Sequence, residues 1–305
     1  MSLATYTDLQ TAVANWLMRA GDTEITGNVA DFITLAESRI HYGSEAQIRT
    51  VPLRIRAMEF GTTLVVNAVL VCGATTGSSN AYAATLAGTT LALGTTLSIT
   101  PNFTNTGAAT LNLNGGGAVA IVSGSSLTAL SGGELISGAP SVVYYNGTQY
   151  VLLPASNGVP LPPGYLAMRS KYLASQPHQA LVQTSPEYGN IIWASNSNSR
   201  PLMFQIEGDT MTFTPPPDGT YYLPMLYWKK FPALSNTQAT NWLMTNKPDT
   251  YLYATLLEAS IFISDDAQAQ KYALLYAASC NALQSQDVRD RYDGTMTIRT
   301  DVQGP

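Results

Sequence analysis

Two histidines are the first candidates for chemistry in this sequence, because an imidazole can move protons or bind a metal ion near neutral pH. His41 and His178 lie in different segments of the chain. Neither has cysteines, a second histidine or carboxylates at the spacing of metal ligands, so the sequence predicts no metal site. We expect His41 to lie at a helix end, as an imidazolium or as a hydrogen-bonded surface ring.

Carboxylates could supply the acid and base of a hydrolase. Asp265 and Asp266 are adjacent, but they begin a predicted helix, where negative charge favours the helix dipole. Four glutamates could meet in space as a glycosidase pair, although the sequence singles out none of them: Glu37, Glu45, Glu59 and Glu258. No G-x-S-x-G motif precedes a helix, so the usual local signal of a serine hydrolase is missing. The sequence therefore predicts no catalytic residue.

Aromatic and glycine-rich stretches offer two further kinds of binding site. Four aromatic residues could form a stacking platform, although packing in a core or an interface is the stronger interpretation; they are Tyr221, Tyr222, Tyr227 and Trp228. The Asn-Gly-Gly-Gly stretch at 114–117 has neither the following helix nor the Lys-Ser/Thr pair of a phosphate-binding loop. We therefore expect no cofactor.

Charge is distributed unevenly along the 305 residues. Glu134 is the only charged residue in 61–163. The formal net charge is −5, and no Lys/Arg cluster is dense enough to grip DNA. Cys72 and Cys280 fall in different predicted domains, so we expect free thiols and synthesis in a reducing cytoplasm. We expect neither a signal peptide nor a membrane span.

The N-terminal segment predicts two amphipathic helices. Thr7 with Gln10 suggests a capping box for the first helix, and the second is expected to run from about Asn28 to Gly43. Each helix has one narrow apolar stripe, so both must pack against other elements; the stripes are Leu9, Ala12, Val13, Trp16 and Leu17, then Val29, Phe32, Ile33, Ala36 and Ile40. Arg54 and Arg56 then alternate with apolar residues along an extended arm, either facing solvent or contacting a neighbouring subunit.

The neutral middle segment predicts short β-strands separated by glycine turns. Alternating apolar residues predict strands on both sides of Gly94 and a hairpin over 109–122. Asn146-Gly147, between runs of Tyr and Val, predicts a hairpin with a two-residue type I′ turn. Many short strands of this kind are typical of a sandwich or a small barrel.

The C-terminal segment predicts strands followed by two helices. A hairpin is expected around Gly208-Asp209, and an aromatic strand after a Pro-Asp-Gly turn. The first helix, with Asn246 as its cap, is apolar almost all round and should be central. The second begins at 264–266 and runs to about Arg291, followed by a polar tail.

Together these patterns predict an α+β protein. We expect an adaptor-like core of about four helices with a small antiparallel β part, formed by residues 1–60 and 158–305. The all-β segment 61–157 interrupts it as an inserted domain, because charge density changes abruptly at both Gly/Pro/Asn-rich borders.

Outside the neutral segment, the chain resembles the head-to-tail adaptor proteins of tailed phages, also called tail tubular or head-completion proteins. The resemblance rests on the opening TYTDLQTAVANWL, on LPPGYLAMRSKYL after the insert, and on the Pro-Asp-Gly turn with KFPALS…NWLMTNKPDTYLY. It covers about two hundred residues in the expected order.

The resemblance implies a structural protein of the virion, assembled in the host cytoplasm, and no enzyme. It implies a homo-oligomeric ring, commonly a dodecamer, that sits beneath the portal protein, passes double-stranded DNA without specific binding and receives the tail nozzle or tail fibres. Family members use their C-terminal ends against the portal, so portal contacts are expected at Asp287, Arg289, Arg291, Tyr292, Met296, Ile298 and Arg299. Subunit contacts are expected at Arg54, Arg56, Tyr227 and Trp228.

The insert departs from the family pattern. Its Thr/Asn-rich strands resemble β modules of phage fibre and tail proteins, so we expect it to face outward and to dock fibres or the nozzle, unless it is a passive elaboration. Two other classes stay open: a cell-wall hydrolase acting at ejection, and a carbohydrate-binding module.

Overall fold

The computed structural model describes residues 3–45, 48–153, 158–174, 180–192 and 197–291. The fold is α+β, as the sequence predicts. The chain divides into two compact units: a helical unit, Met1–Glu59 with Lys230–Pro305, and a β unit, Phe60–Lys229. Residues 158–229, which the sequence places with the adaptor core, therefore pack in the β unit. Whether 61–157 is a separate inserted domain stays a prediction.

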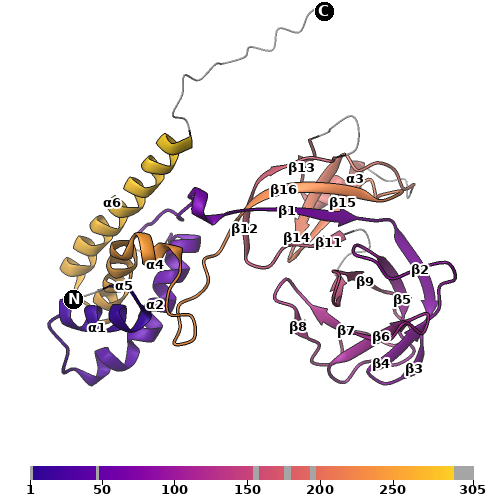
Figure 1. The fold of residues 1–305 in the computed structure, drawn as a ribbon, viewed down its shortest axis with the longest axis horizontal. Coiled ribbons are helices and arrows are strands. Elements are labelled where there is room, and N and C mark those ends of the chain that lie inside the picture. The colour runs from indigo at the N-terminus through magenta and orange to yellow at the C-terminus, as the bar shows by residue number, and fades with distance from the viewer. Residues whose placement is uncertain (1–2, 46–47, 154–157, 175–179, 193–196, 292–305) are drawn as a thin grey trace, which may run out of the picture. The chain divides into compact units, whose positions relative to one another are not determined.

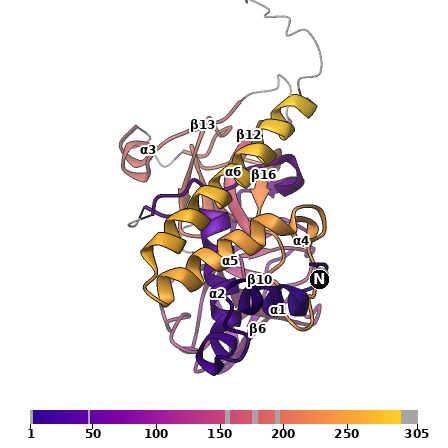
Figure 2. The same ribbon diagram turned by 90° about the vertical axis from the view of Figure 1, so that its left-hand side faces the viewer.

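The helical unit contains five described helices (Figures 1 and 2). They are α1 (Tyr6–Trp16), α2 (Thr23–Tyr42), α4 (Trp242–Asn246), α5 (Pro248–Phe262) and α6 (Asp266–Arg291). Helix α5 packs against both α2 and α6, more extensively than any other pair of helices. Its central position was predicted from its apolar sequence, because a helix that is hydrophobic all round must be buried. A 3₁₀ turn, Arg56–Met58, ends the extended arm that follows α2.

Three helices begin at residues other than those predicted, because other residues occupy their N-cap positions. Thr5, not Thr7, caps α1, in a capping box with Asp8. Asp22 caps α2 by accepting the N–H groups of Glu24 and Ile25, so α2 begins before the predicted Asn28. Asn246 ends α4 and caps nothing; Lys247 precedes α5. The prediction of a carboxylate cap on α6 is confirmed, since Asp265 accepts the N–H of Gln268 at 3.0 Å.

The described strands of the β unit form three sheets. One contains three strands in the order β1-β16-β12, and another contains four in the order β11-β15-β14-β13. Their bounds are β1 (Glu59–Val66), β11 (Gly158–Pro160), β12 (Tyr165–Lys171), β13 (Val182–Gln183), β14 (Met203–Glu207), β15 (Thr210–Thr214) and β16 (Tyr221–Lys229). A short helix that the sequence did not predict, α3 (Pro186–Ile192), lies against β14.

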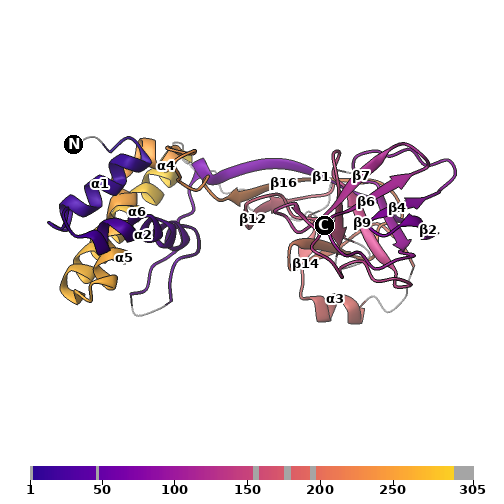
Figure 3. The same cartoon turned by 90° about the horizontal axis from the view of Figure 1, so that it is seen from below.

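The neutral segment forms the third sheet, with nine strands in a mixed parallel and antiparallel arrangement (Figure 3). Its strands are β2 (Val69–Ala74), β3 (Thr76–Ser78), β4 (Ala81–Ala84), β5 (Thr96–Thr100), β6 (Ala109–Leu113), β7 (Ala118–Ser123), β8 (Thr128–Ala129), β9 (Ser141–Tyr145) and β10 (Tyr150–Leu153). Its strands follow the order β2-β5-β9-β10-β7-β6-β4-β3, and β8 pairs with β7. The β content was predicted, but this strand order does not identify the architecture as a sandwich or a barrel.

Three predicted hairpins are confirmed: β6–β7, β9–β10 and β14–β15. The β9–β10 turn was predicted with the wrong length, because Tyr145 pairs with Tyr150 and leaves four residues in the loop. Only Gly147 of the Asn-Gly pair has a positive φ, +98°. The strand predicted before Gly94 is also wrong: this stretch is a turn in which Gly94 has φ +88°.

Two hydrophobic cores stabilise the β unit. One lies within the nine-stranded sheet and includes Leu97, Leu111, Val143 and Tyr150. The other combines residues of the neutral segment with residues that follow it; its members include Val66, Val142, Tyr144 and Leu153 on one side and Val159, Leu173, Phe204, Met211, Phe213 and Leu223 on the other. The neutral segment is thus joined to 158–229 by shared apolar packing.

Asparagine side chains hold the turns of the neutral segment. The amide of Asn114 exchanges hydrogen bonds with the backbone of Leu86 and donates to Thr89. Asn80 accepts the Thr106 N–H and donates to its hydroxyl. Neutral amides can satisfy a donor and an acceptor at once, which accounts for their use in turns that contain almost no charge.

Candidate interaction surfaces

A cluster of charges joins the last turn of α6 to Arg56 and to Glu59, the first residue of β1. The guanidinium of Arg291 lies 2.5 Å from Glu59 Oε1 and 2.7 Å from Asp287 Oδ2. Asp287 also accepts the backbone N–H of Arg56 at 2.9 Å, and Arg56 lies 3.9 Å from Asp290. We call these five residues the α6-end cluster. The Arg291, Glu59 and Asp287 side chains are largely shielded from water, where charged hydrogen bonds are strong, so these three residues hold the helix end in place. The Arg56–Asp290 pair is exposed and adds little.

A groove of about 370 Å³ opens beside the α6-end cluster. Its lining residues come from the arm, from α4 and from α6: Ile55, Arg56, Ala57, Trp242, Asn246, Lys247, Leu283, Gln286, Asp287 and Asp290. Trp242 is 43% exposed, and its ring stacks on Phe231 at 6.1 Å between centroids. An exposed aromatic ring that is fixed by stacking and surrounded by charged groups of both signs is typical of a protein-binding surface.

The predicted portal-contact residues lie partly in this region. Asp287 and Arg291 belong to the α6-end cluster, and Arg289 is exposed on the same turn of the helix. Tyr292, Met296, Ile298 and Arg299 lie outside the described residues. The sequence did not single out Trp242 and Lys247, because the arm, α4 and α6 meet only in the folded chain.

The predicted subunit contacts have different surroundings. Arg54 is half-buried and donates to the carbonyls of His41 and Leu53 within the chain. Tyr227 is 1% exposed in the single chain, and its ring packs on Tyr165 and Phe60 in its own sheet. Arg56 is exposed and Trp228 partly exposed. For all four residues the subunit contact stays a prediction.

The four glutamates considered as candidate acids and bases form hydrogen bonds or ion pairs within the chain. Glu37 accepts the Leu234 N–H at 2.8 Å and the Tyr251 hydroxyl at 3.2 Å, and burial raises its pKa. Ion pairs hold the other three glutamates: Glu258 with Arg39, Glu59 with Arg291, and Glu45 with Arg49. These partners favour structural roles for all four carboxylates.

His41 is buried rather than on the surface. Its Nε2 accepts the backbone N–H of Phe231 at 3.1 Å, and burial, with Lys230 and Arg54 nearby, lowers its pKa to about 4. His41 and Glu37 therefore hold the segment that enters the helical unit from β16. His178 lies outside the described residues. Within the ranges that the structure describes, no three His, Cys, Asp or Glu side chains are grouped as metal ligands.

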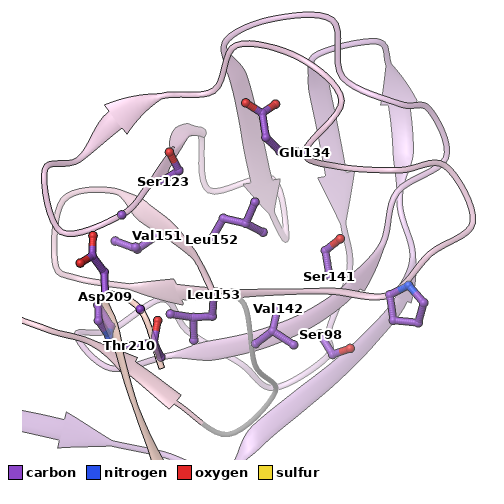
Figure 4. Close-up of a pocket in the computed structure, with 14 residues that line it drawn as sticks. Ser98, Ser123, Glu134, Ser141, Val142, Val151, Leu152, Leu153, Asp209 and Thr210 are labelled. Atoms are coloured by element: carbon purple, nitrogen blue, oxygen red, sulfur yellow. The ribbon is translucent and has the colours of Figure 1, made fainter. Parts of the chain in front are cut away.

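A second candidate surface is a cavity of about 790 Å³ in the β unit (Figure 4). Its lining includes four apolar residues, Val142, Val151, Leu152 and Leu153, and several polar ones; the polar residues include Ser98, Ser123, Glu134, Ser141, Asp209 and Thr210. No aromatic ring is among its described lining residues, so it lacks a flat apolar face on which a sugar could stack.

Both carboxylates at this cavity serve the fold. Glu134 accepts hydrogen bonds from Ser131, Gly132 and Asn105. The Asn105 amide and the Ser131 N–H lower the pKa of this carboxyl to about 2. Asp209 accepts the N–H and the hydroxyl of Ser125, both at 3.1 Å, which joins the β14–β15 turn to the turn after β7. The only charge of the neutral segment thus organises a loop.

The comparison with known families decides the identity. The profile of the SU10 adaptor protein family matches residues 147–299, half of the chain. The chain belongs to this phage adaptor family. The match begins in the β9–β10 turn and includes β11 to β16 and α4 to α6, so it contains the α6-end cluster apart from Arg56 and Glu59. A comparison with curated proteins found no match.

Membership makes this adaptor a structural component of the phage virion and implies interaction with portal or tail components. It confirms the resemblance on which the sequence prediction rests. The confirmed part starts near the end of the neutral segment, so α1, α2 and most of the nine-stranded sheet lie outside the match. In the described part of the adaptor, no helix combines the length and apolar character needed to cross a bilayer.

Proposed function

We propose that this adaptor assembles, in the host cytoplasm, into a ring that joins the portal to the tail and passes DNA through its lumen. The observation that carries the proposal is the family match together with a groove and a charged cluster at the end of α6. A protein that joins two assemblies needs fixed surfaces, and the α6-end cluster supplies one. From the family we expect twelve copies in the ring.

The portal contact is proposed for the end of α6 and the residues that follow it. Arg289 is exposed there, while Asp287 and Arg291 hold the helix end in its position. The groove with Trp242 offers an apolar anchor beside these charges. An anchor of this kind with a charged rim suits a polypeptide partner.

DNA passage without specific binding is supported by the charge of the chain. The formal net charge of −5 gives no long-range attraction for phosphates. A channel that passes DNA at ejection needs a wall with few cationic groups, because each phosphate that a cation neutralises strengthens DNA binding.

The neutral segment is proposed to face outward and to dock tail fibres or the nozzle. Its turns are held by amide hydrogen bonds, and its surface carries almost no charge to repel a partner of either sign. The alternatives are a passive elaboration, a carbohydrate-binding module and a cell-wall hydrolase. The paired glutamates weigh against a hydrolase and the cavity without aromatic rings against a sugar site.

Negative-stain microscopy of the purified full chain mixed with its cognate portal tests the proposal. A ring capping the portal, with regularly spaced knobs outside it, is the expected result. Arg289→Glu should lower the number of adaptor copies on the portal, and Arg49→Glu, a matched reversal at an exposed site, should not. Monomers that ignore the portal would overturn the adaptor ring. Release of soluble sugar from peptidoglycan would instead favour the hydrolase.

A further inference from the structure

The exposed side of α6 is unusual for a helix that faces water. Residues 272–286 contain no charge, although half of this stretch is exposed. We define the α6 face as seven exposed residues in the middle of the helix: Lys271, Leu274, Ala277, Ala278, Asn281, Ala282 and Ser285. Leu274 is 73% exposed, and Lys271 is the only charge. An amphipathic helix normally carries charged side chains opposite its core stripe, so this face is suited to another protein surface.

Helix α2 has a second face of the same character. We define the α2 face as seven exposed residues that follow the first turn of α2, which itself carries the exposed Glu24: Gly27, Ala30, Asp31, Thr34, Leu35, Ser38 and Tyr42. Leu35 is 52% and Tyr42 58% exposed, and Asp31 is the only charge. Among the described residues, neither Asp31 nor Lys271 is part of an ion pair.

The two faces lie on different sides of the helical unit. Helix α5 packs against α2 and against α6, and it runs between them in the view of Figure 2. The core residues of α2 and α6 therefore point toward α5, and the α2 face and the α6 face point away from it. Small residues on both faces allow two helix axes to approach closely.

We propose that a second copy of this chain covers these faces, so that the α2 face of one copy packs on the α6 face of the next and Asp31 pairs with Lys271. Because the two faces point to different sides of the helical unit, a two-fold dimer would form through one face only and would bring Asp31 near Asp31 or Lys271 near Lys271. Single charges of opposite sign favour the head-to-tail arrangement instead, which closes into a ring when the rotation permits. This inference rests on the proposed ring function and names its contact.

Sedimentation velocity of the full chain, alone and with its portal, tests the contact. Asp31→Lys and Lys271→Glu should each weaken self-association at least about tenfold, and the double variant should restore it to within about threefold of wild type. Ala278→Tyr, which fills the α6 face without changing charge, should also block assembly. All three side chains changed are exposed in the single chain, so folding, checked by circular dichroism, should stay the same. Glu45→Lys and Arg49→Glu are matched reversals outside both faces.

The outcomes separate the contact from the function. If wild type forms rings and the three single variants form them equally well, the proposed contact is overturned while the ring stands. If the single variants fail and the double variant does not recover, the pairing of Asp31 with Lys271 is overturned. If wild type stays monomeric even with the portal, both the ring and its contact are overturned.

Discussion

His41 is a neutral ring in the interior of the helical unit, and its protonation should destabilise that unit. Because its Nε2 accepts a hydrogen bond from Phe231, the ring proton must lie on Nδ1. The pKa is about 4 in the folded chain against 6.5 for an ordinary histidine. Between these values the unfolded chain binds a proton that the folded chain excludes, so stability is lost as the pH falls.

We therefore expect the helical unit to lose about 3 kcal/mol of stability between pH 6.5 and about 4. Glu37 acts in the opposite direction, since its raised pKa lets the folded chain take up a proton first. Urea unfolding of wild type and His41→Gln at several pH values isolates the histidine. A loss on acidification that is equally large in His41→Gln would contradict this assignment.

Arg39 and Glu258 form a buried ion pair between α2 and α5. Their side chains are 9% and 10% exposed, and Arg39 also donates to the carbonyl of Ile48 at 3.2 Å. Glu258→Ala leaves the arginine charged without its partner, so we expect a loss of about 3–5 kcal/mol in unfolding free energy. Glu45→Ala, which breaks the exposed pair with Arg49, should change stability little. Equal losses in the two variants would rule out a buried pair.

At the scale of elements, the end of α6 depends on one arginine. Removing the Arg291 guanidinium takes away one cationic partner from each of Glu59 and Asp287. We expect Arg291→Ala to fray the last turn, with amide exchange at 287–291 about tenfold faster, equivalent to about 1.4 kcal/mol. Arg289→Ala is the control, because that side chain is exposed. Unchanged exchange in Arg291→Ala would show that the cluster does not hold the helix.

Local patterns predicted the elements well where one signal dominates. The apolar stripe of α2, the central position of α5 and the three hairpins follow from periodicity and glycine turns. Boundaries were less predictable, because several residues could cap each helix. The folded chain uses Thr5 for α1 and Asp22 for α2, whereas Lys247 precedes α5 without a capping hydrogen bond from its side chain. The stretch before Gly94 alternates like a strand, yet a Cβ on Gly94 would lie 2.6 Å from Val65, which shows a tight turn.

The interaction surfaces could be predicted only in part. Asp287, Arg289 and Arg291 were expected from the family's use of its C-terminal end. The partners of two of them, Arg56 and Glu59, lie more than two hundred residues earlier, so no local pattern could reveal the α6-end cluster. Core or interface packing was the favoured interpretation for Tyr227, which is buried; the sequence could not decide between these two, because an aromatic strand has the same pattern in both.

At the scale of the molecule, the neutral segment and 158–229 are expected to fold together. Val66, Val142, Tyr144 and Leu153 pack with Phe204 and its neighbours in one core. Deleting 62–157 would open that core, so we expect limited proteolysis to cut 158–229 rapidly while the helical signal in circular dichroism persists. Residues 60–229 expressed alone contain both cores and should resist the protease. Protection of 158–229 in the deletion variant would contradict the shared core.

The β unit separates the two halves of the helical unit in the sequence, and this has a consequence during synthesis. The ribosome completes α1 and α2 before it makes the roughly 170 residues of Phe60–Lys229, and only then α5. At about 5–20 residues per second, this delay lasts about 10–30 s. During that time the apolar stripes of α1 and α2 have no α5 to cover them. During this period each nascent chain can aggregate or bind chaperones. The stability of the finished protein does not shorten the period.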